Sequence, residues 1–308
     1  MPFSFRLMIK LVECVPNFSE GRRKDVIDAI VNEARKYKVK ILNVHSDADH
    51  NRTDVTIIGE PEEVKKAVLD MSLKAVELID MNKHKGEHPR MGAMDVVPFV
   101  PLLNTTMEDC IKLAHEFAKE FSEKAEVPCF LYEEAATKPS RKNLADVRRG
   151  EFEGLKEEIG KNPEKTPDYG PNKIHPTAGA TAVGAREFLI AFNVNLATDD
   201  IEIAKKIAKA VRHSSGGYRY VKAMGFEIKE KGIVQVSMNM TNYKKTPLFR
   251  VFETIKREAE RYGTHVLSSE IIGMVPLDAI VDVASFYLQL DEFDSKQIIE
   301  KRLLEEFL

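Results

Sequence analysis

The chain has no tryptophan, only three cysteines and no long apolar run, and each absence narrows the class of protein. Cys14, Cys110 and Cys129 are odd in number and show no metal-ligand spacing, which argues against a disulfide framework or a zinc site. We interpret them as reduced core thiols in a cytoplasmic protein. No apolar stretch approaches the roughly 18 residues that a membrane-spanning helix needs, so we expect no membrane partner.

A strong charge of one sign is also missing. The formal net charge is −3 and the pI is about 6.3, whereas nucleic-acid-binding domains usually show a basic face and a pI above about 9. We therefore expect no nucleic-acid partner. With 43% hydrophobic and 31% charged residues, the composition is that of a globular protein. Its 308 residues are enough for about two domains.

Apolar residues recur at strand and helix spacing in an order that repeats along the chain. In the first half they predict β-α-β-β-α-β, then a further helix and strand. The expected segments are 11–15, 24–37, 39–44, 54–59, 62–80, 96–100, 106–124 and 128–132. Thr106, with Asp109 three residues later, predicts the start of the seventh segment as a capped helix.

The second half predicts the same order of elements. A strand at 187–196 is followed by a helix that Thr198 caps and by strands at 218–228 and 232–240. A helix then starts at Thr246, with Pro247 in its first position, and a strand at 266–272 and two helices finish the chain. We predict an α+β protein of two tandem ferredoxin-like (split β-α-β) subdomains, residues 1–185 and 186–308.

Residues 84–95, with the sequence HKGEHPRMGAMD, are the strongest candidate for a site. Glycine and proline let the backbone turn sharply, which would bring the histidines beside acidic and basic side chains. His88 is the candidate acid/base, because histidine titrates near neutral pH. Gly86 and Pro89 interrupt a helix, so His84 and His88 do not form a helical zinc pair. A purely structural loop is the alternative.

Two further polar segments precede strands or helices. Residues 45–53 hold two histidines and two aspartates whose spacing fits no tight zinc site, and we interpret them as an exposed β-β connection. Arg52 within it can hold a carboxylate with both arms of its guanidinium. In residues 15–22, either Ser19 caps the first helix, or Asn17, Ser19 and backbone amides hold an anionic group. No glycine-rich nucleotide motif is present.

Residues 162–184 contain four prolines and three glycines. This segment is either a linker between the domains or the lining of a ligand cleft between them. In the second case Tyr169, Lys173, His175 and Thr177 would face the ligand.

Five segments together resemble the formiminotransferase domain of formimidoyltransferase-cyclodeaminases and stand-alone glutamate formimidoyltransferases. They are residues 11–21 (LVECVPNFSEG), 51–53 (NRT), 86–95 (GEHPRMGAMD), 167–171 (PDYGP) and 179–195, which ends in FLIAFNVN. The resemblance covers residues 9–308, and the cyclodeaminase part is absent from it.

The resemblance implies transfer of the formimidoyl group from N-formimidoyl-L-glutamate to N5 of tetrahydrofolate, a step of histidine degradation. It implies a cytoplasmic homodimer with two ferredoxin-like subdomains, tetrahydrofolate as co-substrate, no metal, and His88 as catalytic acid/base. Its folate-binding stretch falls on Gly170, Pro171, Asn172, Lys173, Ile174, His175, Pro176, Thr177, Ala178 and Gly179. Substrate-binding candidates are Asn17, Arg52, Lys85, Glu87, Arg90 and Asp95. Among these, Arg52, Lys85 and Arg90, with Lys173, would bind carboxylates, whereas Glu87 or Asp95 would orient the imidazole.

The chain departs from animal members at His45, where they carry an acidic residue, and at Lys173, Ile174 and His175 in the folate stretch. These departures affect the expected pterin contacts more than the chemistry. Two alternatives remain open: a 5-formyltetrahydrofolate-linked formyltransferase or cycloligase-like activity on the same fold, and a non-catalytic folate- or pterin-binding module. The acceptor could also be a modified pterin.

Overall fold

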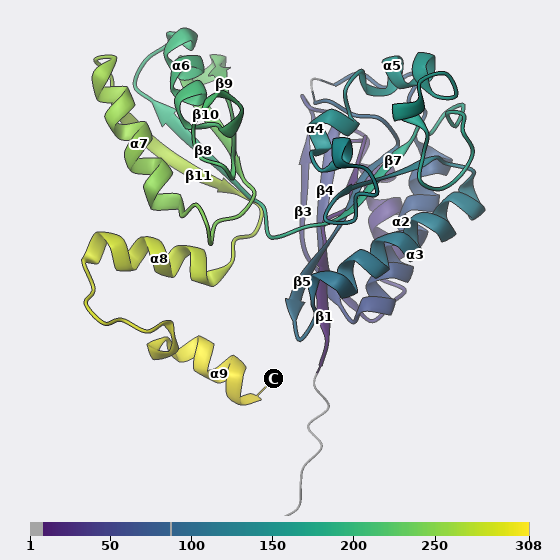
Figure 1. Ribbon diagram of the computed structural model, residues 1–308, viewed down its shortest axis with the longest axis horizontal. Coiled ribbons are helices and arrows are strands. Elements are labelled where there is room, and N and C mark those ends of the chain that lie inside the picture. The colour runs from purple at the N-terminus through teal and green to yellow at the C-terminus, as the bar shows by residue number, and fades with distance from the viewer. Residues whose placement is uncertain (1–8, 87, 308) are drawn as a thin grey trace, which may run out of the picture. The chain divides into compact units, whose positions relative to one another are not determined.

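The chain folds into two compact α+β units (Figure 1). The computed structural model describes residues 9–86 and 88–307, with side chains as far as residue 303. Unit 1 is Met1–Arg186 and unit 2 is Glu187–Leu308. Each contains one sheet and several helices, so the prediction of a mixed α+β chain is confirmed.

Unit 1 is built on a seven-stranded sheet. β3 pairs with β4, β4 pairs with β1 and β2, and both of these pair with β5. The order β5-β7-β6 completes the sheet, and these two pairings are parallel while the others are antiparallel. The strands are β1 (Leu11–Cys14), β2 (Asn17–Phe18), β3 (Val39–Asp47), β4 (Arg52–Gly59), β5 (Met94–Leu103), β6 (Cys129–Glu133) and β7 (Thr181–Ala185).

Apolar side chains cover both faces of this sheet in its β5-β7-β6 part. Along β6, Cys129 and Leu131 belong to the main core, whereas Phe130 and Tyr132 belong to a second, smaller core. Because successive strand residues point to opposite faces, these are the two sides of the sheet. The main core includes side chains of α1 (Lys24–Ala34), α2 (Pro61–Leu78) and α3 (Met107–Ala125). The second includes side chains of α4 (Leu144–Val147) and α5 (Glu151–Glu158).

Several predicted helix features of unit 1 are confirmed. In α2, Val64, Val68, Met71 and Ala75 are buried at helical spacing. Thr106 is the N-cap of α3: its side chain accepts a hydrogen bond from the Asp109 amide, and the Asp109 carboxylate accepts one from the Thr106 amide. This reciprocal capping satisfies two amides that the helix itself leaves without partners.

The interpretation of residues 162–184 as a linker is wrong. The segment lies within unit 1 and ends in β7, which is inserted between β5 and β6. Neither β7 nor α4 and α5 was predicted from the sequence. β7 reads Thr-Ala-Val-Gly-Ala, in which small residues replace the branched apolar side chains that mark most strands. α5 has eight residues, one of them Gly154, and a weak apolar pattern.

Unit 2 contains a four-stranded antiparallel sheet in the order β11-β8-β10-β9. Side chains of α6 and α7 share a core with this sheet. The elements are β8 (Ile190–Leu196), α6 (Ile201–Val211), β9 (Val221–Ile228), β10 (Ile233–Met240), α7 (Leu248–Arg261), β11 (Val266–Ile272), α8 (Leu277–Leu288) and α9 (Ile299–Phe307). β11 and the two closing helices agree with the prediction.

Two predicted helix starts in unit 2 are wrong. Asp200, not Thr198, caps α6 by accepting a hydrogen bond from the Glu202 amide, while the Thr198 hydroxyl accepts one from the Asp200 amide. The N-cap of α7 is Pro247 itself, without a side-chain cap. In both places several residues could cap the helix, and the backbone geometry selects one of them.

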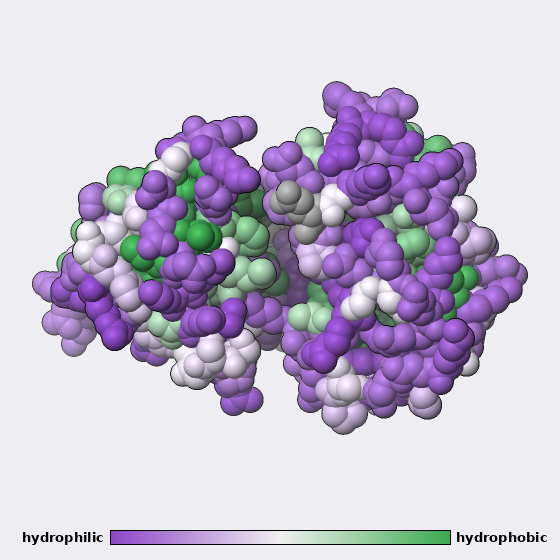
Figure 2. Space-filling model, turned by 90° about the horizontal axis from the view of Figure 1, so that it is seen from above, coloured by the Kyte–Doolittle hydropathy of each residue, from purple (hydrophilic) through white to green (hydrophobic). Residues whose placement is uncertain are grey.

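The three cysteines are buried and free, as predicted. Within the described residues no helix is both long and apolar enough to cross a membrane. Seen from above in Figure 2, the surface of unit 1 is mostly hydrophilic.

Candidate functional site

Three loops of unit 1 meet around the side chain of Asn51. They join β2 to α1, β3 to β4, and α2 to β5. The Asn51 side-chain oxygen accepts a hydrogen bond from the Gly21 amide at 2.9 Å, and its side-chain nitrogen donates to the Lys85 carbonyl at 3.1 Å. The Asn51 carbonyl is 2.9 Å from Nε2 of His84. Asn51 has φ 49°, a left-handed conformation that asparagine tolerates better than most residues.

Close backbone approach also ties these loops together. A Cβ on Gly86 would lie 2.2 Å from the His50 carbonyl oxygen, so only glycine fits against the β3–β4 turn. Gly179 has φ +74°, and a Cβ there would lie 2.3 Å from the Met91 carbonyl oxygen. The loop of residues 84–95 is therefore held between the β3–β4 hairpin and the backbone at Gly179.

Asp95 is the buried centre of the site. One carboxylate oxygen accepts hydrogen bonds from Arg52 at 2.6 Å and from Arg148 at 2.5 Å, and the other accepts from the Met91 amide at 2.7 Å. Burial on its own would raise the pKa of Asp95, but Arg148, Arg52 and the amide outweigh it and lower that pKa to about 2. Asp95 is thus ionised and fixes the two arginines.

Arg52 begins β4 and links Asp95 to the first residue of β2, Asn17. Its Nε donates to the side-chain oxygen of Asn17 at 3.0 Å, and Asn17 donates to the Val15 carbonyl at 2.7 Å. Burial lowers the pKa of Arg52; Asp95 opposes this change and Arg148 reinforces it. We call the three side chains Arg52, Asp95 and Arg148 the arginine–aspartate cluster.

His88 is partly buried and has a defined tautomer. Its Nδ1 lies 2.7 Å from the carbonyl oxygen of Pro89, which can only accept, so Nδ1 carries the proton. Nε2 is then the basic nitrogen. The His50 ring lies edge-on to the His88 ring at 6.0 Å, and Asp47 contacts His50 Nδ1 at 3.1 Å. Burial, reinforced by the charges of Arg52 and Arg148, lowers the pKa of His88 to about 3.

His84 and Arg90 make contacts that brace the loop. Arg90 donates to Glu151 at 2.7 Å and to both oxygens of Glu153 at 2.7 and 2.9 Å, and its Nε donates to His84 Nδ1 at 3.3 Å. His84 Nδ1 is therefore the acceptor, and Nε2 donates to the Asn51 carbonyl. Burial lowers the pKa of His84, with Arg90 adding to the effect. Both side chains are occupied by contacts within unit 1.

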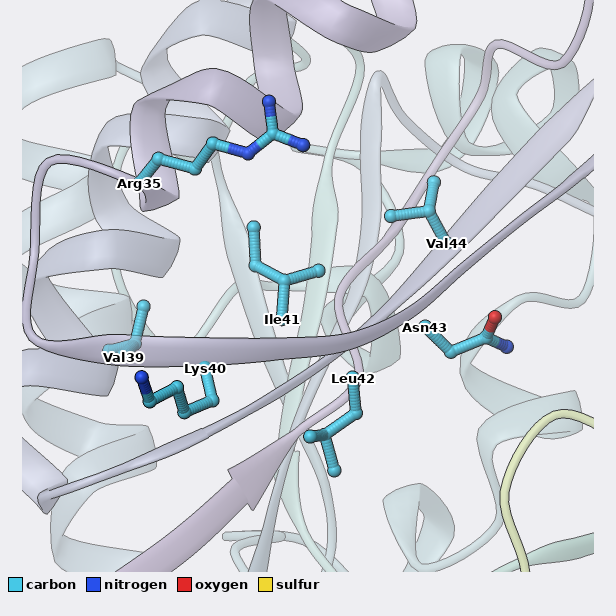
Figure 3. A pocket seen from close by; sticks show the side chains of 7 residues that line it. All are labelled: Arg35, Val39, Lys40, Ile41, Leu42, Asn43 and Val44. Atoms are coloured by element: carbon cyan, nitrogen blue, oxygen red, sulfur yellow. The ribbon is translucent and has the colours of Figure 1, made fainter.

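Lys85 is exposed and lines an open groove of about 650 Å³, together with residues of α5 such as Lys156. Glu87 lies outside the described residues. A second hollow of about 510 Å³ runs along β3 and is lined by Arg35, Val39, Lys40, Ile41, Leu42, Asn43 and Val44 (Figure 3). None of the residues that line this second hollow belongs to the loop of residues 84–95.

Residues 170–179, the stretch that the resemblance assigns to folate, lie against that loop. Ala93 donates to the Ala178 carbonyl at 2.8 Å, and Ala180 donates to the Met91 carbonyl at 2.9 Å. The stretch itself forms a tight turn in which His175 Nδ1 accepts from the Ala178 amide at 2.9 Å. Burial lowers the pKa of His175. Asn172 and Lys173 are exposed, whereas Ala178 and Gly179 are buried.

Two residues of the PDYGP motif anchor the edge of the sheet. The Asp168 carboxylate accepts a hydrogen bond from the Leu131 amide at 2.7 Å and contacts the buried Arg141. Tyr169 contacts His115 of α3 at 2.9 Å through its hydroxyl, so its polar end is bound to α3. The expectation that Tyr169 lines a ligand cleft stays a prediction.

One expectation about the loops is corrected. Ser19 does not cap α1, since its hydroxyl donates to the Gly92 carbonyl at 2.7 Å. Glu20 instead accepts the amides of Arg22 and Arg23 at 2.9 Å each. Residues 45–53 are the predicted β-β connection, with its ends in β3 and β4 and with Asn51 and Thr53 buried. Within the described residues, no group of three His, Cys, Asp or Glu side chains could hold a metal ion.

Sequence reasoning missed Arg148 and Asn51. Arg148 is the C-cap of α4, a four-residue helix in a stretch where no element was predicted, and its partner Asp95 is 53 positions away. No local spacing could reveal that pairing. Asn51 lies in the NRT segment of residues 51–53, but its bonds to Gly21 and Lys85 join residues 30 and 34 positions away, and no local pattern indicates them.

The fold and these contacts define an α+β protein with a neutral histidine beside a buried cationic cluster. The sequence matches the formiminotransferase domain, N-terminal subdomain, at residues 11–186, and the formiminotransferase domain at residues 191–304. The chain belongs to the formiminotransferase family.

Relatives agree with this assignment over nearly the whole chain. A glutamate formimidoyltransferase of Streptococcus pyogenes is 52% identical over 96% of this chain and 100% of its own length. The glutamate formimidoyltransferase of Thermoplasma acidophilum is 48% identical over 96% of this chain and 98% of its own. The chicken formimidoyltransferase-cyclodeaminase is 44% identical over 92% of this chain and 54% of its own length.

Proposed function

We propose that this protein transfers the formimidoyl group of N-formimidoyl-L-glutamate to N5 of tetrahydrofolate, giving 5-formimidoyltetrahydrofolate and L-glutamate. The family and the names of two relatives, 52% and 48% identical to this chain, support this activity. The observation that carries the chemistry is His88, whose Nδ1–H is fixed by the Pro89 carbonyl so that Nε2 can accept a proton. Tetrahydrofolate is a co-substrate, and the step needs no metal.

The reaction requires one proton carrier. The formimidoyl group is an amidine and enters in its protonated, amidinium form. The N5 lone pair attacks the formimidoyl carbon, the C=N π electrons move to the terminal nitrogen, and His88 Nε2 accepts the proton that N5 loses. When the bond from the formimidoyl carbon to the glutamate nitrogen breaks, the lone pair of the terminal nitrogen re-forms the C=N bond. His88 returns its proton to the departing glutamate nitrogen. Acid/base catalysis of this kind typically contributes a factor of about 10²–10⁴.

The free enzyme begins this cycle with His88 as a base. Burial and the charges of Arg52 and Arg148 lower the pKa of His88 to about 3, so its imidazole is neutral at pH 7. A neutral imidazole can take the N5 proton without first losing one. Asp95 acts through the two arginines, because its described contacts are with them and with the Met91 amide.

The remaining site candidates divide by their contacts. Arg52, with Asn17 beside it, lies in the cationic cluster and would bind a substrate carboxylate. Arg90 is paired with Glu151 and Glu153 and would position the loop. The exposed Lys85 and Lys173 would contact the carboxylates of the folate tail, and residues 170–179 would contact the folate. Glu87 remains a candidate by the resemblance of its motif.

We propose the ferredoxin-like fold for both halves, 1–185 and 186–308. Strands β8, β9, β10 and β11 have the order β11-β8-β10-β9, which is 4-1-3-2 for a β-α-β-β-α-β chain. In unit 1, β1, β3, β4 and β5 have the equivalent relation, with β7 and β6 added beyond β5. A cytoplasmic homodimer is part of the same proposal.

The test is an assay of purified protein with N-formimidoyl-L-glutamate and tetrahydrofolate, following release of L-glutamate and formation of the 5-formimidoyl product. We expect His88→Ala to lower kcat by about 10²–10⁴ while folate binding is retained. His213→Ala is the matched control, because His213 is exposed in unit 2. Binding without transfer by the wild type, or transfer only from formyl donors, would refute the proposed reaction. An unchanged kcat in His88→Ala would refute the role of His88.

A further inference from the structure

The arginine–aspartate cluster carries an unbalanced positive charge. Two guanidinium groups share a single carboxylate, with Arg52 at 2.6 Å and Arg148 at 2.5 Å from the same oxygen of Asp95. The Asp95 side chain is 0% exposed, and those of Arg52 and Arg148 are only 11% and 12% exposed. Ionised groups that are shielded from water in this way are stable when an opposite charge pairs with each of them.

Arg148 also has a buried donor without a partner. Its Nε is shielded from solvent and makes no hydrogen bond with any described residue. The other members of the cluster are better satisfied: Arg52 Nε donates to Asn17, and Asp95 accepts on both oxygens. A buried N–H group that is left unpaired is unfavourable, so this donor points to an acceptor that a ligand brings.

His88 lies close enough to this cluster to feel its charge. The groups that act on its imidazole are Arg52 at the start of β4, Arg148 after α4 and Asp95 at the start of β5. Among the described residues, the His50 ring of the β3–β4 turn lies 6.0 Å from the imidazole ring. A protonated His88 would therefore face a cluster that is already positive. One added anion at the cluster would remove this repulsion.

We propose that Arg148 and Arg52 bind the α-carboxylate of the glutamyl donor, and that this carboxylate enables His88 to hold the proton it takes from N5. The inference rests on the proposed function. The α-carboxylate is attached to the carbon that bears the leaving nitrogen, so it stays near the reacting atoms. It brings one negative charge and lone pairs that suit a guanidinium fork.

The proposal orders the proton movements without any further reactant. While the donor is bound, the cluster is neutral overall, and the N5 proton can reside on His88 Nε2. The same proton passes to the glutamate nitrogen as the bond to the formimidoyl carbon breaks. When L-glutamate leaves with its carboxylate, the cluster is positive again and His88 is neutral, as it was at the start.

Kinetics with two donors test the carboxylate contact. N-formimidoyl-4-aminobutyrate keeps the distal carboxylate of N-formimidoyl-L-glutamate and lacks the α-carboxylate. In the wild type we expect kcat/KM to be about 10- to 100-fold lower with this donor, the usual value of a charge-assisted contact. In Arg148→Gln we expect kcat/KM to become nearly equal for the two donors. Each ratio compares two substrates on one variant, so partial misfolding does not affect it.

Arg149→Gln is the matched control. Arg149 is the next residue, its side chain is 80% exposed, and it pairs with Asp146. Arg149→Gln should keep the wild-type ratio of kcat/KM between the two donors. Arg148→Lys should give a ratio between those of the wild type and Arg148→Gln, because the positive charge remains while the guanidinium fork is lost. If Arg148→Gln discriminates between the donors as strongly as the wild type does, the proposal is overturned.

An NMR titration of His88 separates this inference from the proposed reaction. L-Glutamate alone is the probe, so no turnover is needed. We expect the pKa of His88, about 3 without ligand, to rise when wild-type protein is saturated with L-glutamate. In Arg148→Gln the starting pKa should be higher and the response to L-glutamate smaller. An identical His88 titration with and without L-glutamate in the wild type would overturn the proposal even if the transfer assay succeeds.

Discussion

Replacing Asp95 with asparagine should destabilise unit 1 more than the replacement of an exposed aspartate with asparagine. The ordinary pKa of 3.8 is lowered to about 2 in the fold. At about 1.4 kcal/mol per unit of pKa, this difference contributes about 2–3 kcal/mol to the free energy of unfolding at neutral pH. Asp95→Asn also leaves Arg52 and Arg148 without their shared counter-charge. We expect a total loss of about 3–5 kcal/mol, typical of a broken buried ion pair.

The pH dependence of stability gives the sign of the Asp95 effect. Because its folded pKa lies below the ordinary value, the Asp95 contribution is fully present above about pH 4 and is lost as the pH falls toward 2. Urea unfolding followed by circular dichroism should therefore show the gap between wild type and Asp95→Asn narrowing over this range.

Asp28→Asn is the control for this experiment. Asp28 pairs with Lys24 on α1 at 3.1 Å, with its side chain 53% exposed, and exposed pairs contribute only about 0–1 kcal/mol. Adding Arg148→Gln to Asp95→Asn should recover part of the loss, since one of two mutually repelling charges is gone. Equal unfolding free energies for Asp95→Asn and Asp28→Asn would refute the reasoning.

Three further outcomes can be measured. Asn51→Ala should lower the free energy of unfolding by about 1–3 kcal/mol, because two hydrogen bonds are lost and alanine is strained in the left-handed backbone conformation. It should also lower kcat. An active, fully stable variant would contradict this. Gly86→Ala should be destabilising by about 1–3 kcal/mol, because its Cβ would meet the His50 carbonyl. The control Gly154→Ala in α5, with open space around it, should gain about 0.5–1 kcal/mol. A thiol reagent should modify no cysteine in the native protein, because Cys14, Cys110 and Cys129 are all buried there, and it should modify all three after denaturation.

Long amphipathic segments could be predicted from the sequence because their signal is local. α2 and α3 alternate buried and exposed residues at helical spacing, and the capping pair Thr106 and Asp109 lies three residues apart. β7 could not be predicted in this way, since a strand of small residues is recognisable only by its neighbours β5 and β6. The same limit applies to α4, whose four residues carry no periodic pattern.

The candidate site shows the same division between local and long-range signals. The loop of residues 84–95 could be found from its residue types, because proton carriers, charges and turn residues are rarely so dense. Which of its side chains are occupied could not be found, since Arg90 pairs with glutamates about 60 positions away. Arg148 could not be predicted for the same reason, since its partner Asp95 is 53 positions away. Its contact with Asp95 shows that this carboxylate binds arginines, whereas the sequence suggested that it orients the imidazole.

The position of β7 also constrains how unit 1 can fold during synthesis. Among the described strands, β6 pairs with β7, which is the last strand of the unit in the sequence. A growing chain that has not yet reached Thr181 lacks the strand that joins β6 to the sheet. α4 follows β6, and the second core to which it belongs includes Ala180 and Ala182 at and beside β7. We therefore expect the contact between Arg148 and Asp95 to form late, after β7 has joined the sheet.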